Sequence, residues 1–205
     1  MAPPWKTWQR LWRLSRLREP YRGWLGRDDG ALVSIDCETT SLKVKEAEIL
    51  SIAAVRIEGN RIGAGEAFYT LIKPQQAPGR ENVQVHGLRP RDFSEGVPLQ
   101  EALEKFLQFI GGRTLLGYYL QYDVAVLNKH LKPLLGAALP NREIEISGHY
   151  YDWRFAKHPD GYIDLRWDTM AHTLGIPALP RHDAMNDAIT AAMMYLALQA
   201  RGYGG

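Results

Sequence analysis

The feature that most constrains the fold is a run of three β-type segments joined by short connections. Residues 31–36 (ALVSID) form an apolar run that ends in an acid, and residues 49–57 (ILSIAAVRI) are rich in β-branched side chains. Gly59-Asn60 then has the composition of a two-residue hairpin turn, which leads into a third segment extending to Ile72. Because short turns join antiparallel neighbours, we expect the sheet to begin with antiparallel strands.

The second half of the chain alternates between helical and strand patterns. Residues 99–110 place their apolar side chains on one helical face, and Gly111-Gly112 is expected to end that helix. The segments that follow are a strand over residues 114–118 and helices over residues 124–135, 165–174 and 184–201. Three strands followed by alternating helix and strand predict an α/β domain with a mixed sheet.

The composition is that of an ordinary globular protein. Of the 205 residues, 45% are apolar and 23% are charged, which excludes a disordered or fibrous chain. No stretch approaches the roughly 18 consecutive apolar residues of a membrane span, and arginines interrupt the N-terminus where a secretory signal needs an apolar run. Cys37 is the only cysteine, so no internal disulfide can form, and we expect a cytoplasmic protein.

Residues 1–29 are expected to form a basic arm, distinct from a domain over residues 30–205. The arm holds seven basic and three acidic side chains, whereas the rest of the chain is slightly acidic. Its apolar residues have helical spacing, with Pro20 ending the helix; they are Trp5, Trp8, Leu11 and Trp12. The tryptophans are expected either to pack onto the domain or to form a surface for nucleic acid, an anionic membrane or a partner protein.

Two carboxylates lie at the end of the first predicted strand. Asp36 and Glu38 are two residues apart, and side chains at positions i and i+2 of a strand project to the same face. Adjacent like charges are unfavourable unless a cation neutralises them, and a hard divalent ion with oxygen ligands, Mg²⁺ or Mn²⁺, suits this pair. Taken alone, however, two acids are also what a solvent-exposed strand end commonly carries.

Three further polar residues are ordinary when each is considered singly. Asp123 follows the fourth predicted strand and opens a helix, where an acid also serves as an N-terminal cap or a helix-dipole partner. Asp187 lies in the first turn of the last predicted helix, and His182 precedes it on the loop that enters that helix. A loop histidine by itself predicts no function.

Together, these five residues belong to an ordered set of motifs. The motifs are Asp36-x-Glu38-Thr39-Thr40, then Gly117 followed by Tyr122-Asp123, and finally His182-x4-Asp187. Over residues 31–200 this order resembles the DnaQ-like (DEDDh) 3′–5′ exonuclease family. The resemblance implies a ribonuclease H-like α/β fold, with a mixed five-stranded sheet flanked by helices, over residues 30–205.

The resemblance also implies a role for each residue. Two divalent metal ions, Mg²⁺ or Mn²⁺, would be held by four carboxylates: Asp36, Glu38, Asp123 and Asp187. Asp36 would bridge both ions, Asp123 would act at the second ion, and His182 would accept the proton of the attacking water. Substrate contacts are implied for Thr39, Leu42 and His86, with Leu42 wedged against the terminal base.

The chain departs from the family pattern at several positions outside these five residues. Ser41 stands where the first motif usually has glycine, and Tyr118-Tyr119 replaces the usual His-Asn of the second motif. The two tyrosines are expected either to stack on bases or to pack internally. Asp152 resembles the family's usual aspartate after the second helix and is expected to be structural, with Trp153 in place of the customary threonine.

The function implied by the resemblance is a metal-dependent 3′–5′ exonuclease that releases nucleoside 5′-monophosphates from single-stranded 3′ ends. DNA is favoured over RNA as the substrate. A stand-alone repair or processing enzyme is favoured because the chain ends directly after the last predicted helix, at Gly205. The alternatives are a proofreading subunit of a DNA polymerase and a nucleic-acid-binding module without catalysis.

Overall fold

A mixed β-sheet forms the centre of the molecule in the computed structural model, which describes residues 4–75 and 87–203. Within these residues the sheet has six strands in the order β3-β2-β1-β5-β6, and β4 pairs with β2 as well. The strands are β1 (Leu32–Thr39), β2 (Ile49–Glu58), β3 (Arg61–Ile62), β4 (Phe68–Leu71), β5 (Thr114–Gly117) and β6 (Glu143–Glu145). Strand β1 is antiparallel to β2 and parallel to β5, so the predicted mixed sheet with an antiparallel start is confirmed.

The number of strands differs from the predicted five because the third predicted strand is divided. A short 3₁₀ helix (Ala64–Glu66) separates β3 from β4, although both strands pair with β2. Gly63 and Gly65 lie in this interruption, where glycine weakens a continuous strand. The three-residue β6, with the sequence Glu-Ile-Glu, was too short and polar for its pattern to indicate a strand.

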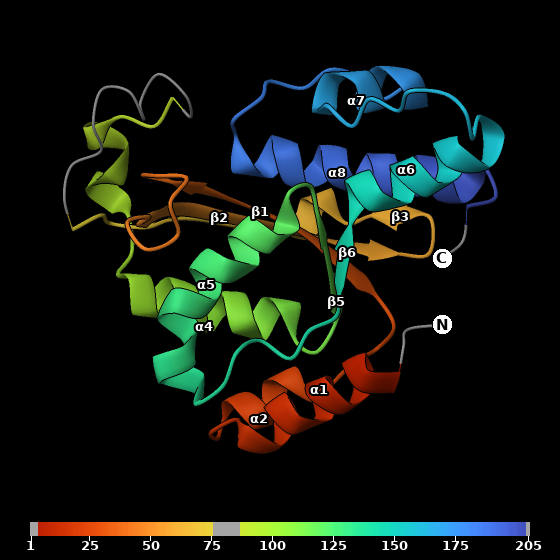
Figure 1. Ribbon diagram of the computed structural model, residues 1–205. Coiled ribbons are helices and arrows are strands. Elements are labelled where there is room, and N and C mark those ends of the chain that lie inside the picture. Colours follow the sequence, from red (N-terminus) through yellow and green to blue (C-terminus); the bar gives the residue numbers. More distant parts are fainter. Residues whose placement is uncertain (1–3, 76–86, 204–205) are drawn as a thin grey trace.

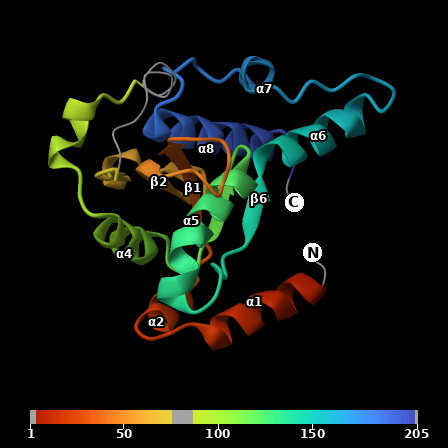
Figure 2. The ribbon, with the colours of Figure 1, turned by 60° about the vertical axis from the view of Figure 1, so that its left-hand side comes forward.

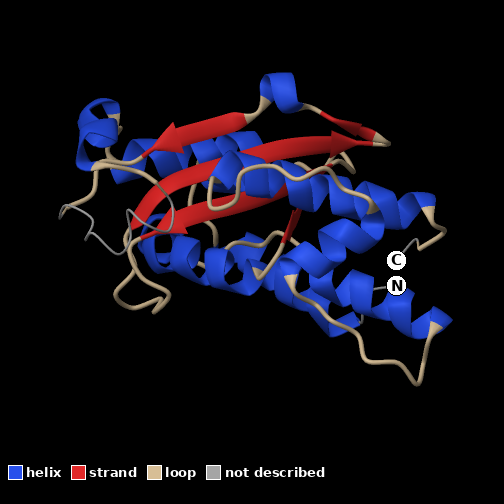
Figure 3. Cartoon of the chain, turned by 90° about the horizontal axis from the view of Figure 1, so that it is seen from above, coloured by secondary structure: helices blue, strands red, loops and turns tan. Residues whose placement is uncertain are grey.

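Helices cover both faces of the sheet, as Figures 1 and 3 show. The helices are α4 (Leu99–Ile110), α5 (Leu120–Leu135), α6 (Ile146–Lys157), α7 (Trp167–Leu174) and α8 (Ala184–Ala200). Helices α4 and α5 share one apolar cluster with β1 and β2, whereas α6, α7 and α8 share a second cluster with the other face. The result is a three-layer α/β arrangement, in which β1 is sandwiched between the two helical layers.

Most predicted helices are observed, with shifted ends. Helix α4 has the predicted bounds, whereas α5 begins four residues earlier than the predicted 124–135 and includes Pro133 near its end. Helix α6 was not predicted. Its buried residues Ile146, Tyr150 and Trp153 follow the i, i+4, i+7 spacing of an amphipathic helix, so the signal was present in the sequence.

The N-terminal arm packs beneath α4 and α5 (Figures 1 and 2). It contains α1 (Pro4–Arg16) and α2 (Tyr21–Leu25). Three arm residues belong to the same apolar cluster as α4 and α5; they are Leu17, Tyr21 and Leu25. The division of the chain into an arm over residues 1–29 and a domain over residues 30–205 stays a prediction.

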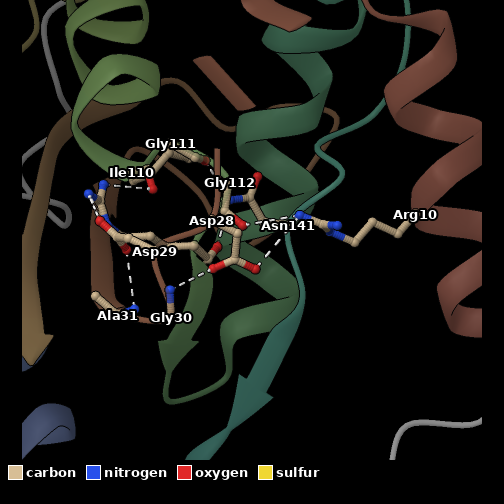
Figure 4. A network of polar contacts seen from close by, with 10 residues as sticks. Arg10, Asp28, Asp29, Gly30, Ala31, Ile110, Gly111, Gly112 and Asn141 are labelled. Carbon is tan, nitrogen blue, oxygen red and sulfur yellow. Dashed lines mark hydrogen bonds and ion pairs between the residues drawn. The ribbon is translucent and has the colours of Figure 1, made fainter. Parts of the chain in front are cut away.

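Polar contacts fix the arm to the loop between α4 and β5, and Figure 4 draws those that involve Arg10, Asp28 and Asp29. The backbone N–H of Gly112 donates to the Arg27 carbonyl at 2.7 Å, and a Cβ at Gly112 would lie 2.6 Å from that same oxygen. Only glycine therefore permits this close approach. The Arg113 guanidinium donates to both carboxylate oxygens of Asp29, and Asn141 donates to the carbonyls of Gly111 and Arg113.

Helix α1 carries Arg10 and Arg13 toward the body of the protein and its tryptophans toward solvent, while the exposed Arg16 lies over the Trp12 ring. Arg13 donates to the Leu139 carbonyl at 2.8 Å, and Arg10 contacts the Gly112 carbonyl and Asp28. The outward stripe has exposed fractions between 50% and 73% and consists of Trp5, Trp8, Leu11 and Trp12. The expectation that the tryptophans pack onto the domain is therefore wrong. In the part of the chain that the structure describes, no helix is long and apolar enough to cross a membrane.

Candidate active site

Three carboxylates meet near the end of β1, where β1 and α8 come together. Asp36 lies opposite Ala53 of β2 in the strand register. Ala53 packs with Ala184 and Ala188 of α8, and these small side chains let the helix approach the sheet closely. The approach brings Asp187 to the two acids of β1, so that one oxygen from each of Asp36, Glu38 and Asp187 lies within 4.8 Å of the others.

Asp123 enters the same region from the opposite side of the sheet, on the first turn of α5. Its side chain is only 4% exposed and makes a hydrogen bond with Cys37 of β1. A Cβ at Gly117 would lie 3.1 Å from the Ile35 carbonyl, so a glycine there permits the tight passage from β5 into α5. Asp123 does not belong to the three-carboxylate group, but its charge acts on Asp36.

Glu145, a residue that sequence analysis missed, anchors the start of α5. Its carboxylate accepts hydrogen bonds from the backbone N–H groups of Tyr119 and Leu120 at 3.1 and 2.8 Å. It also accepts from the backbone N–H and the hydroxyl of Ser147, at the start of α6. One carboxylate therefore satisfies the free N–H groups of two helices. Asp152, by contrast, lies outside the cleft and accepts a hydrogen bond from the Tyr203 hydroxyl.

His182 lies at the edge of the acidic group, on the loop before α8. Its side chain is exposed, and its backbone adopts a left-handed conformation with φ of 59°. The His182 N–H donates to Oδ2 of Asp187 at 3.1 Å, while Asp183 caps α8 by accepting from the Asn186 N–H. Arg181 brings a positive charge to the acids and lies 5.0 Å from the centre of the Trp167 ring.

The crowded carboxylates have strongly perturbed acidities. Burial raises the pKa of Asp36 well above its usual value, and the neighbouring carboxylates raise it further, against a small opposing effect of Arg181. Burial, followed by the charges of Asp187 and Asp183, raises the pKa of Glu38 to about 7. The pKa values of Asp123 and Asp187 are also raised, mainly by burial. Without a cation, therefore, some of these groups hold protons near neutral pH.

A cleft of about 380 Å³ opens over these acids. The residues that line it include every candidate site residue within the described chain. They are Asp36, Cys37, Glu38, Thr39, Ser41, Leu42, Tyr118, Tyr119, Tyr122, Asp123, Trp167, Arg181, His182 and Asp187. The Leu42 side chain is 84% exposed at this cleft. The Thr39 hydroxyl, by contrast, forms a hydrogen bond of 2.6 Å with the Tyr122 hydroxyl. His86 falls outside the residues that the structure describes.

The arrangement suits hard divalent cations. All the converging ligand atoms are carboxylate oxygens, which Mg²⁺ and Mn²⁺ prefer. A bound cation would also lower the raised pKa values by favouring the charged carboxylates. Next to the acids, His182 supplies a group that can accept a proton from water.

A protein-family model matches most of this chain. The model of the RNase_T family, described as "Exonuclease", matches residues 33–195. The matched segment contains all five residues of the carboxylate and histidine set.

Two curated proteins illustrate the sequence similarity. The DNA polymerase III subunit epsilon of Aquifex aeolicus is 31% identical over 113 residues, which cover 55% of each protein. A DNA polymerase III subunit epsilon-like protein of Rhodobacter capsulatus is 30% identical over 185 residues, covering 85% of this chain but 25% of that protein. The chain thus spans about half or less of the length of these relatives.

Solved structures share the fold at lower sequence identity. Escherichia coli exonuclease I, in a complex with a dA16 oligonucleotide, superposes with a TM-score of 0.70 at 17% identity. The match covers 84% of this chain and 41% of exonuclease I. The likeness supports the same arrangement of strands and helices.

The raised pKa of Glu38 predicts how stability depends on pH when a chelator keeps metal away. The folded state binds a proton with a pKa of about 7, against an ordinary value of 4.5. This proton stabilises the fold at low pH, and its contribution is lost as the pH rises through about 7. For a shift of this size the loss is about 3 kcal/mol.

We therefore expect Glu38→Gln to become more stable than the wild type as the pH rises from 5 to 8 in EDTA. Urea unfolding at several pH values would measure this difference. Glu58→Gln, at an exposed end of β2, is the matched control. A difference between Glu38→Gln and the wild type that does not change with pH would contradict the electrostatic account.

Proposed function

Because the chain belongs to the RNase_T exonuclease family, of the DnaQ-like type with a ribonuclease H-like fold, we propose that it is a metal-dependent 3′–5′ exonuclease. In this proposal it releases nucleoside 5′-monophosphates from the 3′ ends of single strands. The observation that carries the proposal is the convergence of Asp36, Glu38 and Asp187 within 4.8 Å, beside His182 and beneath an open cleft. A module that only binds nucleic acid has no need to crowd partly buried carboxylates against one another.

Two divalent cations fit the residues that are present. Asp36, Glu38 and Asp187 would hold one ion, and Asp36 with Asp123 would hold the second. The raised pKa values support this assignment, because burial, joined at Asp36 by the charges of the neighbouring carboxylates, outweighs the opposing effect of Arg181. When bound, the ions would supply Lewis-acid stabilisation of the phosphoryl oxygens and help to generate the nucleophile.

His182 is the proposed general base. It would take a proton from the water that attacks the terminal phosphodiester. The new bond joins the water oxygen to phosphorus, while the bond from phosphorus to the 3′ oxygen of the preceding nucleotide breaks and that oxygen takes up a proton from a solvent water. The products are a nucleoside 5′-monophosphate and a strand with a new 3′ hydroxyl. The hydrogen bond from the His182 N–H to Asp187 fixes this loop to a proposed metal ligand.

The proposed substrate is single-stranded DNA. Aromatic side chains line the cleft, and stacking on aromatic rings accommodates single strands of any sequence. The preference for DNA over RNA draws on the relatives, which carry DNA polymerase III names, and on the oligonucleotide complex of exonuclease I. The exposed Leu42 is a proposed contact to the terminal base, and Thr39 a proposed substrate contact beside it.

We expect Mg²⁺- or Mn²⁺-dependent loss of nucleotides from the 3′ end of labelled single strands, and no loss in EDTA. Asp36→Asn and His182→Ala should each reduce cleavage by about 10²-fold or more, because each removes a group proposed to act in the reaction. A gel assay on 3′- and 5′-labelled DNA and RNA strands measures both the direction and the substrate preference.

Two exposed residues outside the cleft provide matched controls. Asp160→Asn and His158→Ala change the same residue types and should leave cleavage unaffected. Near-normal turnover by Asp36→Asn or His182→Ala would overturn the assigned roles. If the wild type binds strands but cleaves none with any metal, the binding-module alternative replaces this proposal.

A second candidate function is that of a proofreading subunit, and the stripe on α1 favours it. Exposed apolar patches commonly mark protein interaction sites, and Trp5, Trp8 and Trp12 follow the i, i+3, i+7 spacing of a helix that docks in a groove. The two central arginines of α1 contact backbone carbonyls of the body, which favours an apolar protein groove over an anionic membrane.

A cytoplasmic location stays a prediction.

The polymerase alternative predicts that the stripe binds the catalytic subunit of the replicative polymerase from the same organism. Replacing Trp8 and Trp12 together with alanine should weaken that complex about tenfold or more, since buried tryptophans often dominate protein interfaces. Biolayer interferometry with the purified subunit measures the affinity. The matched control replaces the exposed, stacked pair Tyr151 and Phe155 of α6. If the wild type forms no complex, the stand-alone enzyme is favoured.

A further inference from the structure

Tyr119, at the start of α5, has an unusual backbone conformation for its residue type. Its φ is 56°, in the left-handed region that only glycine, and to a lesser extent Asn and Asp, adopts readily. Among the described residues, Tyr119 and His182 are the two non-glycine residues with positive φ, and both line the cleft. Strain of this kind persists only where the surrounding structure holds it, and it is concentrated at functional sites.

The carboxylate of Glu145 holds Tyr119 in this conformation. It accepts hydrogen bonds from the N–H groups of Tyr119 and Leu120, at 3.1 and 2.8 Å. Glu145 is fixed in turn by two hydrogen bonds from Ser147. The backbone at the start of α5 is therefore tied to the start of α6, and the direction of the Tyr119 side chain is set by this tie.

The ring of Tyr119 stacks on the ring of Tyr122 at the mouth of the cleft. The ring centres are 6.4 Å apart and the planes differ by 21°, while the Tyr119 side chain remains 68% exposed. Tyr122 is a rigid support, because its hydroxyl contacts both the Thr39 hydroxyl and the Ser41 carbonyl. The pair forms an aromatic step next to the loop that carries Leu42.

The neighbouring Tyr118 is used differently. Its ring meets the Trp167 ring edge-on, with centres 5.1 Å apart, and its hydroxyl donates to the Leu165 carbonyl at 3.2 Å. Tyr118 is thus committed to internal packing. Both tyrosines that depart from the family motif line the cleft, but Tyr118 is held by these contacts, whereas the 68% exposed Tyr119 presents its ring to a ligand.

We propose that Tyr119, supported by Tyr122, is a binding site for one unpaired base of the substrate strand. This inference rests on the proposed function and deepens it by assigning a base-stacking subsite that the family motif, with Asn at this position, does not supply. A tyrosine face accepts any base, so the subsite contributes affinity for unpaired strands without reading their sequence. A base that remains paired in a duplex cannot reach the ring in this way, so the subsite favours single-stranded ends.

The first test compares Tyr119→Asn with the wild type on a DNA single strand. Asn tolerates the left-handed conformation, so the substitution removes the ring without adding backbone strain. We expect KM for the strand to rise about tenfold, with a smaller change in kcat, because the lost stack binds substrate and does no chemistry. Tyr119→Phe keeps the ring and should restore a wild-type KM. The exposed Tyr162→Asn, outside the cleft, is the matched control.

The second test identifies the stacked base. A series of strands each carries one abasic nucleotide, at the first, second or third position from the 3′ end. At one of these positions the KM of the wild type should rise to the KM of Tyr119→Asn. Neither protein can form the stack with that strand, because the base is absent. Equal KM values for wild type and Tyr119→Asn on intact strands, or a Tyr119→Asn defect that persists at every abasic position, would overturn the proposal.

The two proposals fail in distinguishable ways. If the wild type cleaves no strand with any metal, the exonuclease proposal fails, and the same variants are then compared by anisotropy of a labelled strand. Equal affinities there also overturn the stacking proposal. If the wild type cleaves strands while Tyr119→Asn matches it, only the stacking proposal fails.

Discussion

Mutual repulsion among carboxylates that are partly or fully buried is the constraint on which the rest of this structure depends. Asp36 is surrounded by the charges of Asp123, Glu38 and Asp187, and its burial makes each of these charges more costly. The fold nevertheless brings the acids together from three elements. Alanines let α8 approach the sheet, Gly117 allows the tight entry into α5, and Glu145 fixes the start of that helix. Without a cation, such a group of carboxylates lowers the stability of the folded protein. Cations that bind only the folded state would offset this loss.

Two further features follow from the way the helices begin. The left-handed residues Tyr119 and His182 both lie at helix starts, and a carboxylate accepts the backbone N–H of each. In one case the acceptor is Glu145, which is tied to α6, and in the other it is Asp187 within the acidic group. The same interaction thus projects an aromatic ring and an imidazole toward one cleft. Helix α1 shows a comparable division, with Arg10 and Arg13 contacting the body and the tryptophans facing solvent.

Local patterns in the sequence predicted a large part of this structure. The i, i+2 spacing of Asp36 and Glu38 predicted their shared direction, and the apolar periodicity predicted α4 residue for residue. The grouping of four acids came from the family resemblance of the motif order, and three of those four converge. The predictions for Asp36, Glu38 and α4 succeeded because strand alternation and helical periodicity are local properties.

Other features depend on contacts between distant residues and left no local signal. Glu145 caps a helix that begins 25 residues earlier in the chain, so its own neighbours do not reveal the partner. The helical spacing of the arm tryptophans is the same whether that face is buried or exposed. Its orientation follows from the distant carbonyls of Gly112 and Leu139, which bind the arginines on the other face.

The central claim is that the acids near the end of β1 are partly protonated alone and become charged when they bind metal. Calorimetric titration of Mn²⁺ at pH 7, repeated in buffers with different ionisation enthalpies, measures this most directly because it counts the protons released. The account predicts saturable binding of about two ions per chain with net proton release, since Glu38 has a pKa of about 7 without metal. Absence of saturable binding, or binding without proton release, would contradict it.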